Sequence, residues 1–422
     1  MQYEEHTRAM RYACVKLQLG EWHMKLREIG LGASLMGSVF VPAAGAFAQA
    51  TTTRATPSKV DLLFVVDNSS SMQGEQTALR AQIPALIRQL TQDPDHPVKD
   101  LHVGVVSTDM GIPGVEFPPS CHADGGDDGR LRHRPDTQAA PSCEGDYPQY
   151  QSYDARYDNA DQIADAVSCT ATLGLGGCGF EQPLESAFKA LWPRADDTYR
   201  FISTTIEGTY GRGDVPEAEG GNLGFLRNDP DDPSLIAIVL LTDEEDCSVK
   251  TTEHLKPNNQ LPEDSPYRQE DINLRCFLHK EFQYDLKIRY LDGLRALRPG
   301  REDLVFFSVI AGVPTDLVDS AALQNVNFDD SASRERFYSA ILNDMRMQEQ
   351  VDPATSPGTG QGNLKPSCSR VVAGETTPST AYPPRRLVEL ARQFGEQGFV
   401  QSICQDDLSP AVSAILERLI RR

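Results

Sequence analysis

Four apolar segments of strand length constrain the fold of this chain most strongly. They are residues 60–66, 101–106, 235–241 and 304–310. They lack the polar–apolar alternation of a half-exposed strand, and such runs are typical of strands that are covered on both faces in a parallel sheet. Helical patterns lie between them. The alternation predicts an α/β fold: a doubly wound, mostly parallel sheet flanked by helices.

The expected helices show apolar residues at helical spacing. The stripes are Leu79, Ile83, Leu86 and Leu90; Leu184, Phe188 and Leu191; residues 284–297; and Val412, Ile415, Leu416 and Leu419, which follow a Ser409–Pro410 start. Pro84 is expected to kink or restart the first of these helices. Segments 110–165 and 349–383 are rich in Pro, Gly, Asp and Ser. We expect them to be long insertions, pinned by disulfides, in a single domain spanning residues 58–422.

Residues 1–50 are expected to be an N-terminal extension followed by a signal peptide, the signal itself covering residues 24–50. Lys25 and Arg27 form a basic start, residues 29–41 are mostly apolar, and residues 46–50 offer small-x-small cleavage sites. A membrane anchor is the alternative, but the apolar part is short and rich in Gly and Ala. No later run approaches the ~20 apolar residues of a membrane span. The chain is therefore predicted to be secreted, periplasmic or at the cell surface, with no membrane span after cleavage.

Cysteine usage agrees with export. Eight of the nine cysteines follow the signal, and an even number in an exported chain predicts disulfides. The candidates are Cys121, Cys143, Cys169, Cys178, Cys247, Cys276, Cys368 and Cys404. Sequence alone leaves 105 pairings open. We expect the neighbour scheme 121–143, 169–178, 247–276 and 368–404, because each pair closes a local loop. A zinc site is the rival interpretation, but the chain contains no Cys-x-x-Cys.

The net charge disfavours one class of partner. Sixty-one acidic residues stand against forty basic ones, a net charge of −21. Such a field repels a polyanion, so nucleic acid is not an expected partner.

Two polar clusters follow two of the apolar runs directly. Asp67, Ser69 and Ser71 form an Asp-x-Ser-x-Ser motif after the first run, and Asp243 lies in an acidic cluster, residues 242–246, after the third. In an open α/β sheet, ligands bind outside the carboxyl ends of the strands. If the two strands are neighbours, these oxygens converge. Carboxylate and hydroxyl oxygens suit hard divalent cations, so we expect Mg²⁺ first, with Ca²⁺ or Mn²⁺ as alternatives.

These residues resemble the von Willebrand factor type A domain. The metal-ion-dependent adhesion site of that family begins with Asp-x-Ser-x-Ser after the first strand, and Leu241-Thr242-Asp243 resembles its later strand with the second Asp. The resemblance extends more loosely from Ser58 to Arg422. It implies that Ser69 and Ser71 bind the metal directly, while Asp67 and Asp243 bind it or hold its waters. One position then stays open for a carboxylate of the partner.

The chain departs from that family in one loop. The family has a Thr before a helix between the two motifs, whereas residues 176–184 of this chain contain none. Glu181 is the oxygen donor in its place. It could add a ligand and shift the preference towards Ca²⁺, occupy the open position, or serve only as an acidic residue in the first turn of a helix. Residues 177–181, 224–227 and 402–404 also resemble a secreted bacterial branch of the family.

Four further signals are given ordinary interpretations. Arg212-Gly213-Asp214, the tripeptide read by integrins, is taken as a coincidence, and residues 124–129 as a solvated turn that lacks the regular spacing of a calcium loop. Residues 244–246 are expected to be rim charges. Arg385 and Arg386 are expected to pair with this acidic surface.

The expected function is binding of a protein or peptide partner that offers a carboxylate to the bound cation. A structural scaffold whose metal site is closed by Glu181 is one alternative, and a metal-dependent hydrolase is another. An enzyme is not the preferred prediction. The chain has no Gly-x-Ser-x-Gly elbow, no Gly-rich phosphate loop and no His-Glu-x-x-His motif.

Overall fold

The central element is a six-stranded sheet in the order β3-β2-β1-β4-β5-β8, in which only β3 is antiparallel to its neighbour. The computed structural model describes residues 58–115, 120–121, 125–202, 210–355, 363–371 and 378–420. The strands of the sheet are β1 (Lys59–Val66), β2 (Asp100–Ser107), β3 (Gln151–Asp154), β4 (Leu235–Leu241), β5 (Val305–Ala311) and β8 (Gly398–Ser402). The predicted extension and signal peptide lie outside the described residues.

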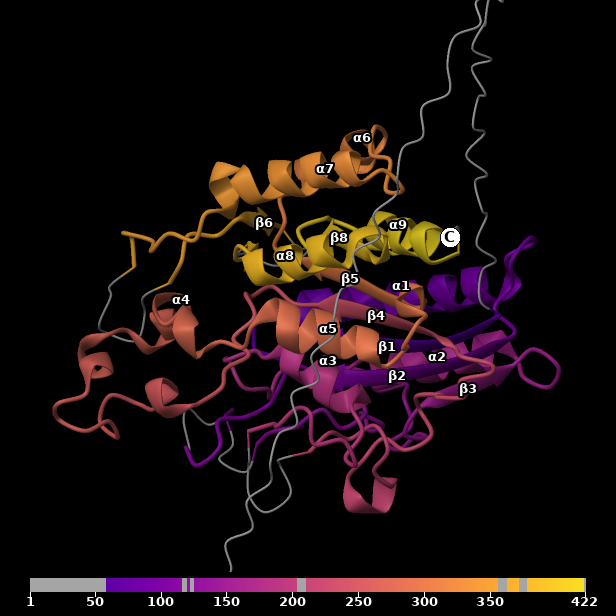
Figure 1. The fold of residues 1–422 in the computed structure, drawn as a ribbon, viewed down its shortest axis with the longest axis horizontal. Coiled ribbons are helices and arrows are strands. Elements are labelled where there is room, and N and C mark those ends of the chain that lie inside the picture. Colours follow the sequence, from indigo (N-terminus) through magenta and orange to yellow (C-terminus); the bar gives the residue numbers. More distant parts are fainter. Residues whose placement is uncertain are drawn as a thin grey trace, which may run out of the picture. The chain divides into compact units, whose positions relative to one another are not determined.

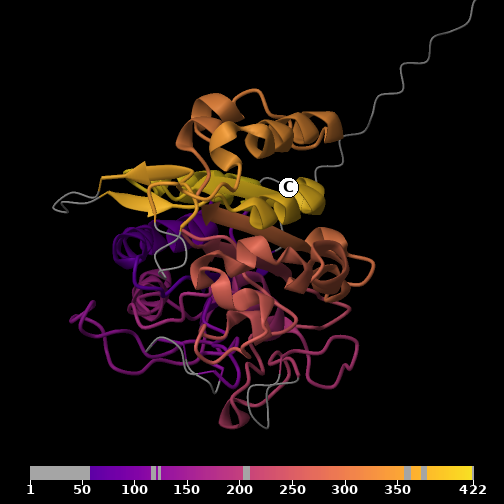
Figure 2. The ribbon, with the colours of Figure 1, turned by 90° about the vertical axis from the view of Figure 1, so that its left-hand side faces the viewer.

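Helices cover both faces of this sheet (Figure 1). The helices are α1 (Gln73–Gln92), α2 (Ala160–Thr170), α3 (Pro183–Leu191), α4 (Arg275–Leu278), α5 (Asp292–Ala296), α6 (Ser320–Leu323), α7 (Ser331–Asn343), α8 (Arg385–Phe394) and α9 (Ser409–Ile420). Contacts group α2, α1 and α9 in one layer and α3, α5 and α8 in the other, with α7 packed outside α8 near the β8 edge (Figures 1 and 2). The predicted α/β class, a mostly parallel sheet flanked by helices, is confirmed.

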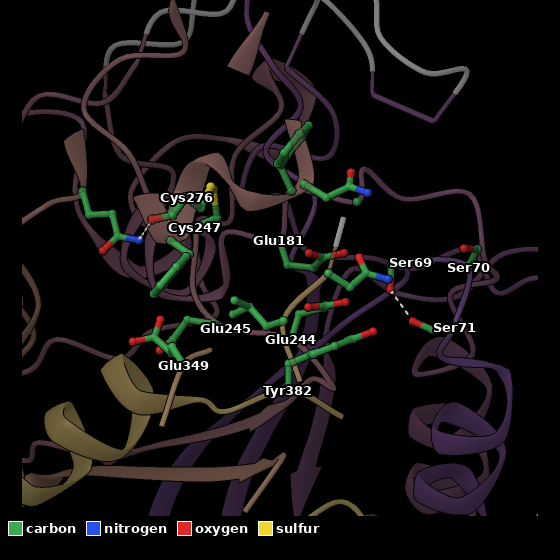
Figure 3. A pocket seen from close by; sticks show the side chains of 17 residues that line it. Ser69, Ser70, Ser71, Glu181, Glu244, Glu245, Cys247, Cys276, Glu349 and Tyr382 are labelled. Atoms are coloured by element: carbon green, nitrogen blue, oxygen red, sulfur yellow. Dashed lines mark hydrogen bonds between the residues drawn. A yellow bond between two sulfur atoms is a disulfide. The ribbon is translucent and has the colours of Figure 1, made fainter. Parts of the chain in front are cut away.

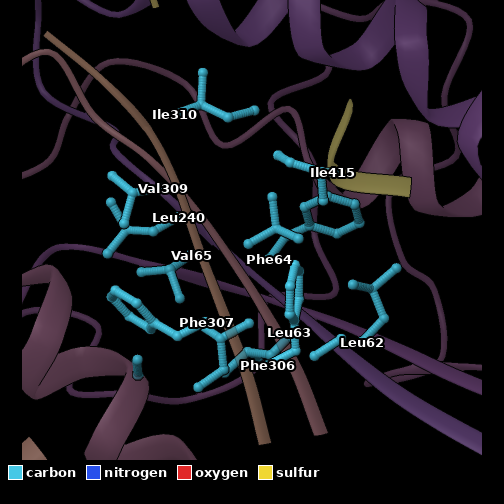
Figure 4. Close-up of a cluster of buried hydrophobic side chains, with 14 of the residues drawn as sticks. Leu62, Leu63, Phe64, Val65, Leu240, Phe306, Phe307, Val309, Ile310 and Ile415 are labelled. Carbon is cyan, nitrogen blue, oxygen red and sulfur yellow. The ribbon is translucent and has the colours of Figure 1, made fainter. Parts of the chain in front are cut away.

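The four apolar runs became β1, β2, β4 and β5 because both faces of these strands are covered. Every residue of β4 and β5 is buried, and the labelled side chains of β1, β4 and β5 pack into one cluster with Ile415 of α9 (Figure 4). Asp61, the polar residue inside the first run, is also buried. Its carboxylate accepts hydrogen bonds from Arg227 Nε at 2.7 Å and Arg227 N at 2.9 Å. Burial of the apolar side chains supplies the main driving force for this layered core.

Two expected helices differ in detail from the pattern. Pro84 lies inside α1, which continues from Gln73 to Gln92 without a restart. One missing backbone donor is tolerated because Leu79, Ile83, Leu86 and Leu90 are all buried on the sheet side. The stripe at 284–297 forms a π-helical turn, Leu286–Leu291, followed by α5.

The two predicted insertions contain regular structure. Strand β3 lies inside 110–165 and extends the sheet beyond β2. The segment 349–383 contains the hairpin of β6 (Cys368–Arg370) and β7 (Ser379–Ala381). The described residues all belong to one compact unit that begins at Thr53.

All eight candidate cysteines form disulfides, but half of the neighbour scheme is wrong. The pairs 247–276 and 368–404 are as predicted, whereas Cys121 pairs with Cys178 and Cys143 with Cys169. The reason is tertiary. Cys121 and Cys178 lie together in a small second core with Phe180 and Cys247, while Cys143 contacts the end of α2. Four disulfides fit an oxidising compartment outside the cytosol. Within the described residues, no helix combines the length and apolar character required to cross a bilayer.

The expected solvated turn at 124–129 is wrong over the described residues 125–129. The side chain of Asp128 is 1% exposed and forms ion pairs with Lys189 and Arg212, both of which are fully buried. Arg212 is therefore a structural cation beneath the surface. The tripeptide that it begins does not present its guanidinium to a partner.

Candidate functional site

The topology places the two predicted motifs side by side. Strands β1 and β4 are parallel neighbours with Val66 opposite Leu241, so Asp67 and Asp243 leave the sheet at the same edge. The Asp67 backbone N–H continues the ladder by donating to Leu241 O at 2.9 Å. The chain order also reverses between β1 and β4, because β2 and β3 lie on one side and β5 and β8 on the other. Such a switch point is where open α/β sheets bind ligands.

Asp67 is held rigidly at this point. Its Oδ2 accepts a hydrogen bond from Thr242 Oγ1 at 2.6 Å, and its Oδ1 accepts one from the Ser69 backbone N–H at 2.8 Å. The Gln76 side chain, from the first turns of α1, donates to Asp67 O and to Gly174 O, each at 2.9 Å. Full burial raises the pKa of Asp67, and the hydrogen bonds from Thr242 and Ser69 oppose that shift.

The two serines of the motif lie next to this carboxylate. Ser69 is 5% exposed and Ser71 is exposed at the start of α1. Their hydroxyl oxygens are 3.2 Å apart, and Figure 3 shows them turned towards each other. Both hydroxyls are therefore placed at the edge of the sheet, at the junction between the motif loop and the helix.

Asp243 is the least satisfied buried group at this edge. It is 2% exposed, yet neither carboxylate oxygen accepts a hydrogen bond of normal geometry within the described residues. Burial first, and then the nearby charge of Asp67, raise the pKa of Asp243 to about 8, while the Ser71 hydroxyl lies close enough to oppose the shift. Two buried oxygens without donors are a costly arrangement unless something else satisfies them.

Glu181 and Glu244 add two more carboxylates. The backbone of Glu181 is tied to the β4 loop, because Cys247 N donates to Glu181 O at 2.8 Å. Burial, followed by the charge of Asp67, raises the pKa of Glu181; burial, followed by the charge of Asp243, raises that of Glu244. Figure 3 shows both carboxylates pointing towards the space beside Ser69 and Tyr382. Over the described ranges, no three His, Cys, Asp or Glu side chains are arranged to hold a metal ion. The predicted ligand set contains only two such side chains, Asp67 and Asp243, and its other two members are the hydroxyls of Ser69 and Ser71.

The expected rim charges are wrong for Asp246, which is fully buried. Its carboxylate accepts from Leu184 N at the start of α3, from Ser248 Oγ and from Arg386 Nε. The backbone N–H of Arg386 donates to Glu245 Oε2 at 2.8 Å. The expected pairing of Arg386 with the acidic cluster is thus confirmed, while Arg385 lies 3.9 Å from Glu349. These contacts anchor the β4 loop between α3 and α8.

A pocket of about 310 Å³ opens beside the serine motif. Acidic side chains, hydroxyls and aromatic rings form most of its wall. The lining residues are Ser69, Ser70, Ser71, Gly179, Phe180, Glu181, Glu244, Glu245, Cys247, Asn273, Cys276, Phe277, Gln283, Glu349, Asn363, Leu364 and Tyr382. None of these residues is basic.

Comparisons with known proteins do not assign this chain to a family. No family model matches it, and no curated protein does. Similar solved structures include proximal thread matrix protein 1 from the mussel byssus, with 11% identity, a TM-score of 0.23 and coverage of 61% of this chain and 38% of that one. The pilus adhesin SpaC from Lactobacillus rhamnosus GG matches with 13% identity, a TM-score of 0.26 and coverage of 61% and 25%. This chain therefore spans well under half of either protein, and similarity at this level supports no conclusion.

The sequence interpretation missed several side chains at this edge. Thr242 binds Asp67, and the Thr108 hydroxyl, at the end of β2, also lowers the pKa of Asp67. A hydroxyl residue within two positions of the end of an apolar run was the available signal for both. Tyr382 had no such signal: it is brought here by the β6–β7 hairpin, and its backbone N–H donates to Asp243 O at 2.8 Å.

Proposed function

We propose that this chain is an exported interaction module, similar to a von Willebrand factor type A domain, that binds a protein or peptide partner through a divalent cation. Asp67, Ser69, Ser71 and Asp243 would hold the cation, with Mg²⁺ as the first expectation. The observation that carries this proposal is the pair of Asp243 oxygens, buried and without donors, next to the Ser71 hydroxyl. A hard cation is the ligand that such oxygens lack.

The order of the strands supports the same proposal. The motifs meet at the switch point between β1 and β4, where the carboxyl ends of parallel strands expose loops to a ligand. Asp67 is already satisfied by Thr242 and Ser69, so it would orient the site, while Asp243 and the serines offer free lone pairs. The cation supplies a positive charge that a partner carboxylate can bind.

Calorimetric titration of the full chain with Mg²⁺, Mn²⁺ and Ca²⁺ tests the cation site. Wild type should bind at least one of them, and the Ser69→Ala/Ser71→Ala double variant and Asp243→Asn should each lose most of that binding. Asp316→Asn, at an exposed ion pair with Arg346, is the matched control and should bind as wild type does. Equal binding by all four proteins would contradict the site.

Partner binding needs a second measurement. Capture of an envelope protein by the immobilised chain should be abolished by EDTA and restored by excess Mg²⁺. A partner that is retained in EDTA, or by the Asp243→Asn variant, would exclude a cation-mediated contact.

One observation favours a structural scaffold as the second candidate. Glu181 is 5% exposed, and its carboxylate faces the serines from the opposite loop (Figure 3). If it closes the cation's open position, metal would raise the melting temperature without any uptake of an acidic ligand. Glu181→Gln should then create acetate binding in the presence of Mg²⁺, whereas an open site binds acetate already in wild type.

A further inference from the structure

The acidic pocket beside the serine motif has more negative charge than a cation at the predicted site can balance. The loops after β1 and β4 bring Asp67, Asp243 and Glu244 to one edge of the sheet, where Glu181 faces them, and none of these four carboxylates forms an ion pair within the described residues. With all four carboxyl groups ionised around a bound divalent cation, two negative charges would remain uncompensated. The remaining charge is concentrated on Glu181 and Glu244, which line the pocket.

The other two glutamates of the pocket are already satisfied. Glu349 is paired with Lys280, and Glu245 accepts backbone hydrogen bonds from Asp246 and Arg386. The excess acceptor capacity is therefore localised at the end of the pocket nearest Ser69, where Figure 3 shows the carboxylates of Glu181 and Glu244 turned the same way.

A neutral side chain in the same wall also lacks a donor. Gln283 lines the pocket, is 4% exposed and uses its Nε2 to donate to Cys276 O at 3.1 Å and to Asp246 O at 3.4 Å. Its Oε1 is buried and accepts no hydrogen bond within the described residues. This acceptor is not a carboxylate and, like the glutamates, lacks an N–H donor.

The chemistry of the wall distinguishes an organic cation from a second metal ion. The described part of the chain contains no three acidic or His or Cys side chains arranged to bind a metal. Phe180, Phe277 and Tyr382 instead provide aromatic surface beside the carboxylates. Aromatic rings pack against an alkyl stem and attract an ammonium or guanidinium group. The volume, about 310 Å³, lies at the small end of the range for ligand pockets, about 300–1,000 Å³.

We propose that this pocket takes a basic side chain, arginine or lysine, of the partner whose carboxylate meets the cation. The inference rests on the proposed function for the nature of the partner, but the pocket can be tested without it. The guanidinium or ammonium would donate to Glu181, Glu244 and Gln283 while its stem lies against the aromatic residues. The preferred partner segment then carries a basic and an acidic residue close together.

The test titrates the full chain with n-butylguanidinium and with its neutral isostere n-butylurea, both in Mg²⁺ and in EDTA. Butylguanidinium should bind wild type, and butylurea should bind about tenfold more weakly or not at all, because a charge-assisted hydrogen bond is lost. Glu244→Gln and Glu181→Gln should each weaken butylguanidinium binding by about fivefold or more. Glu219→Gln, which changes the net charge equally outside the pocket, should change it by less than about twofold.

Equal binding of the two probes, or unchanged affinity in Glu244→Gln, would overturn the proposal. Glu244 is half-buried and makes no ion pair in the described structure, so its variant decides the question even if Glu181→Gln does not fold. The same titrations distinguish a failure of the proposed cation site from a failure of this pocket. Loss of Mg²⁺ binding with retained butylguanidinium binding rejects the cation site alone, and the reverse result rejects the basic-group pocket alone. Spermidine serves as the probe for a free polyamine: tighter binding of spermidine than of butylguanidinium overturns the assignment to a partner side chain.

Discussion

Two buried carboxylates of this protein have opposite surroundings. Asp128 is 1% exposed and lies between Lys189 and Arg212, whereas Asp243 is 2% exposed and has no hydrogen-bonding partner of normal geometry in the described residues. The first arrangement is closed, because the carboxylate has its counter-charges inside the protein: Lys189, Arg212 and, at 4.0 Å, Arg130. The second is open. The difference shows that this fold can satisfy a buried acid when no ligand is needed, and that the carboxyl edge of β1 and β4 is left unsatisfied.

The largest expected effect comes from breaking the closed arrangement. Asp128→Asn removes the one carboxylate that the buried cations Lys189 and Arg212 share, so two buried positive charges lose their common counter-charge. We expect a loss of about 3–5 kcal/mol in the free energy of unfolding, measured by urea denaturation. The control is Arg134→Met, which breaks an exposed ion pair with Asp146 and should leave the free energy of unfolding nearly unchanged. Similar losses of stability in the two variants would mean that the buried ion pairs of Asp128 stabilise the protein no more than an exposed ion pair does.

A neutral substitution at the open carboxylate should have the opposite sign. Asp243→Asn removes a carboxyl group whose ionised form is opposed by burial and by the charge of Asp67, so in EDTA the variant should be more stable than wild type by a few kcal/mol at neutral pH. The same variant should lose the rise in melting temperature that Mg²⁺ gives to wild type. Destabilisation in EDTA would show that the Asp243 carboxylate is satisfied in the folded protein after all.

The dependence of stability on pH sharpens the comparison further. The pKa of Asp243 is about 8 in the folded protein against 3.8 for a free aspartate, so the folded state retains a proton that the unfolded state has lost. Its contribution to stability is therefore complete below pH 4 and is lost as pH rises towards 8. In EDTA, wild type should lose several kcal/mol relative to Asp243→Asn across this window, because each pKa unit is worth about 1.4 kcal/mol; thermal unfolding at several pH values measures the loss. A constant difference between the two proteins would contradict the assignment.

The sheet was largely predictable because its strands are locally marked. The apolar runs 60–66, 101–106, 235–241 and 304–310 each match a strand to within a residue at each end. Strand β3 was missed because Gln151–Asp154 is polar and half-exposed, and β8 because Gly398–Ser402 is short and carries two polar residues. Edge strands have one neighbour only and need less apolar sequence than central ones.

The candidate site was predictable in part for the same reason. Asp67 and Asp243 each follow a marked strand, and the pairing of β1 with β4 brings their loops together. Tyr382 and Gln283 reach the pocket from segments far along the chain that carry no motif. The wrong disulfide prediction for Cys121 has a similar origin. Short loop length favoured Cys143 as its partner, but Cys121 pairs with Cys178 in the second small core around Phe180, which no local pattern revealed.

The amino-acid sequence by itself determined the α/β class, the order of the buried strands along the chain and the two motifs that follow them. These depend on local patterns of apolar and polar residues, which set the burial of each strand before any partner is chosen. Only the tertiary structure decided which buried acids obtain a counter-charge. Asp128 meets Lys189 and Arg212 from distant segments, while Asp243 and Glu181 meet mainly other acids. That outcome depends on contacts between remote parts of the chain, and a local pattern contains no information about them.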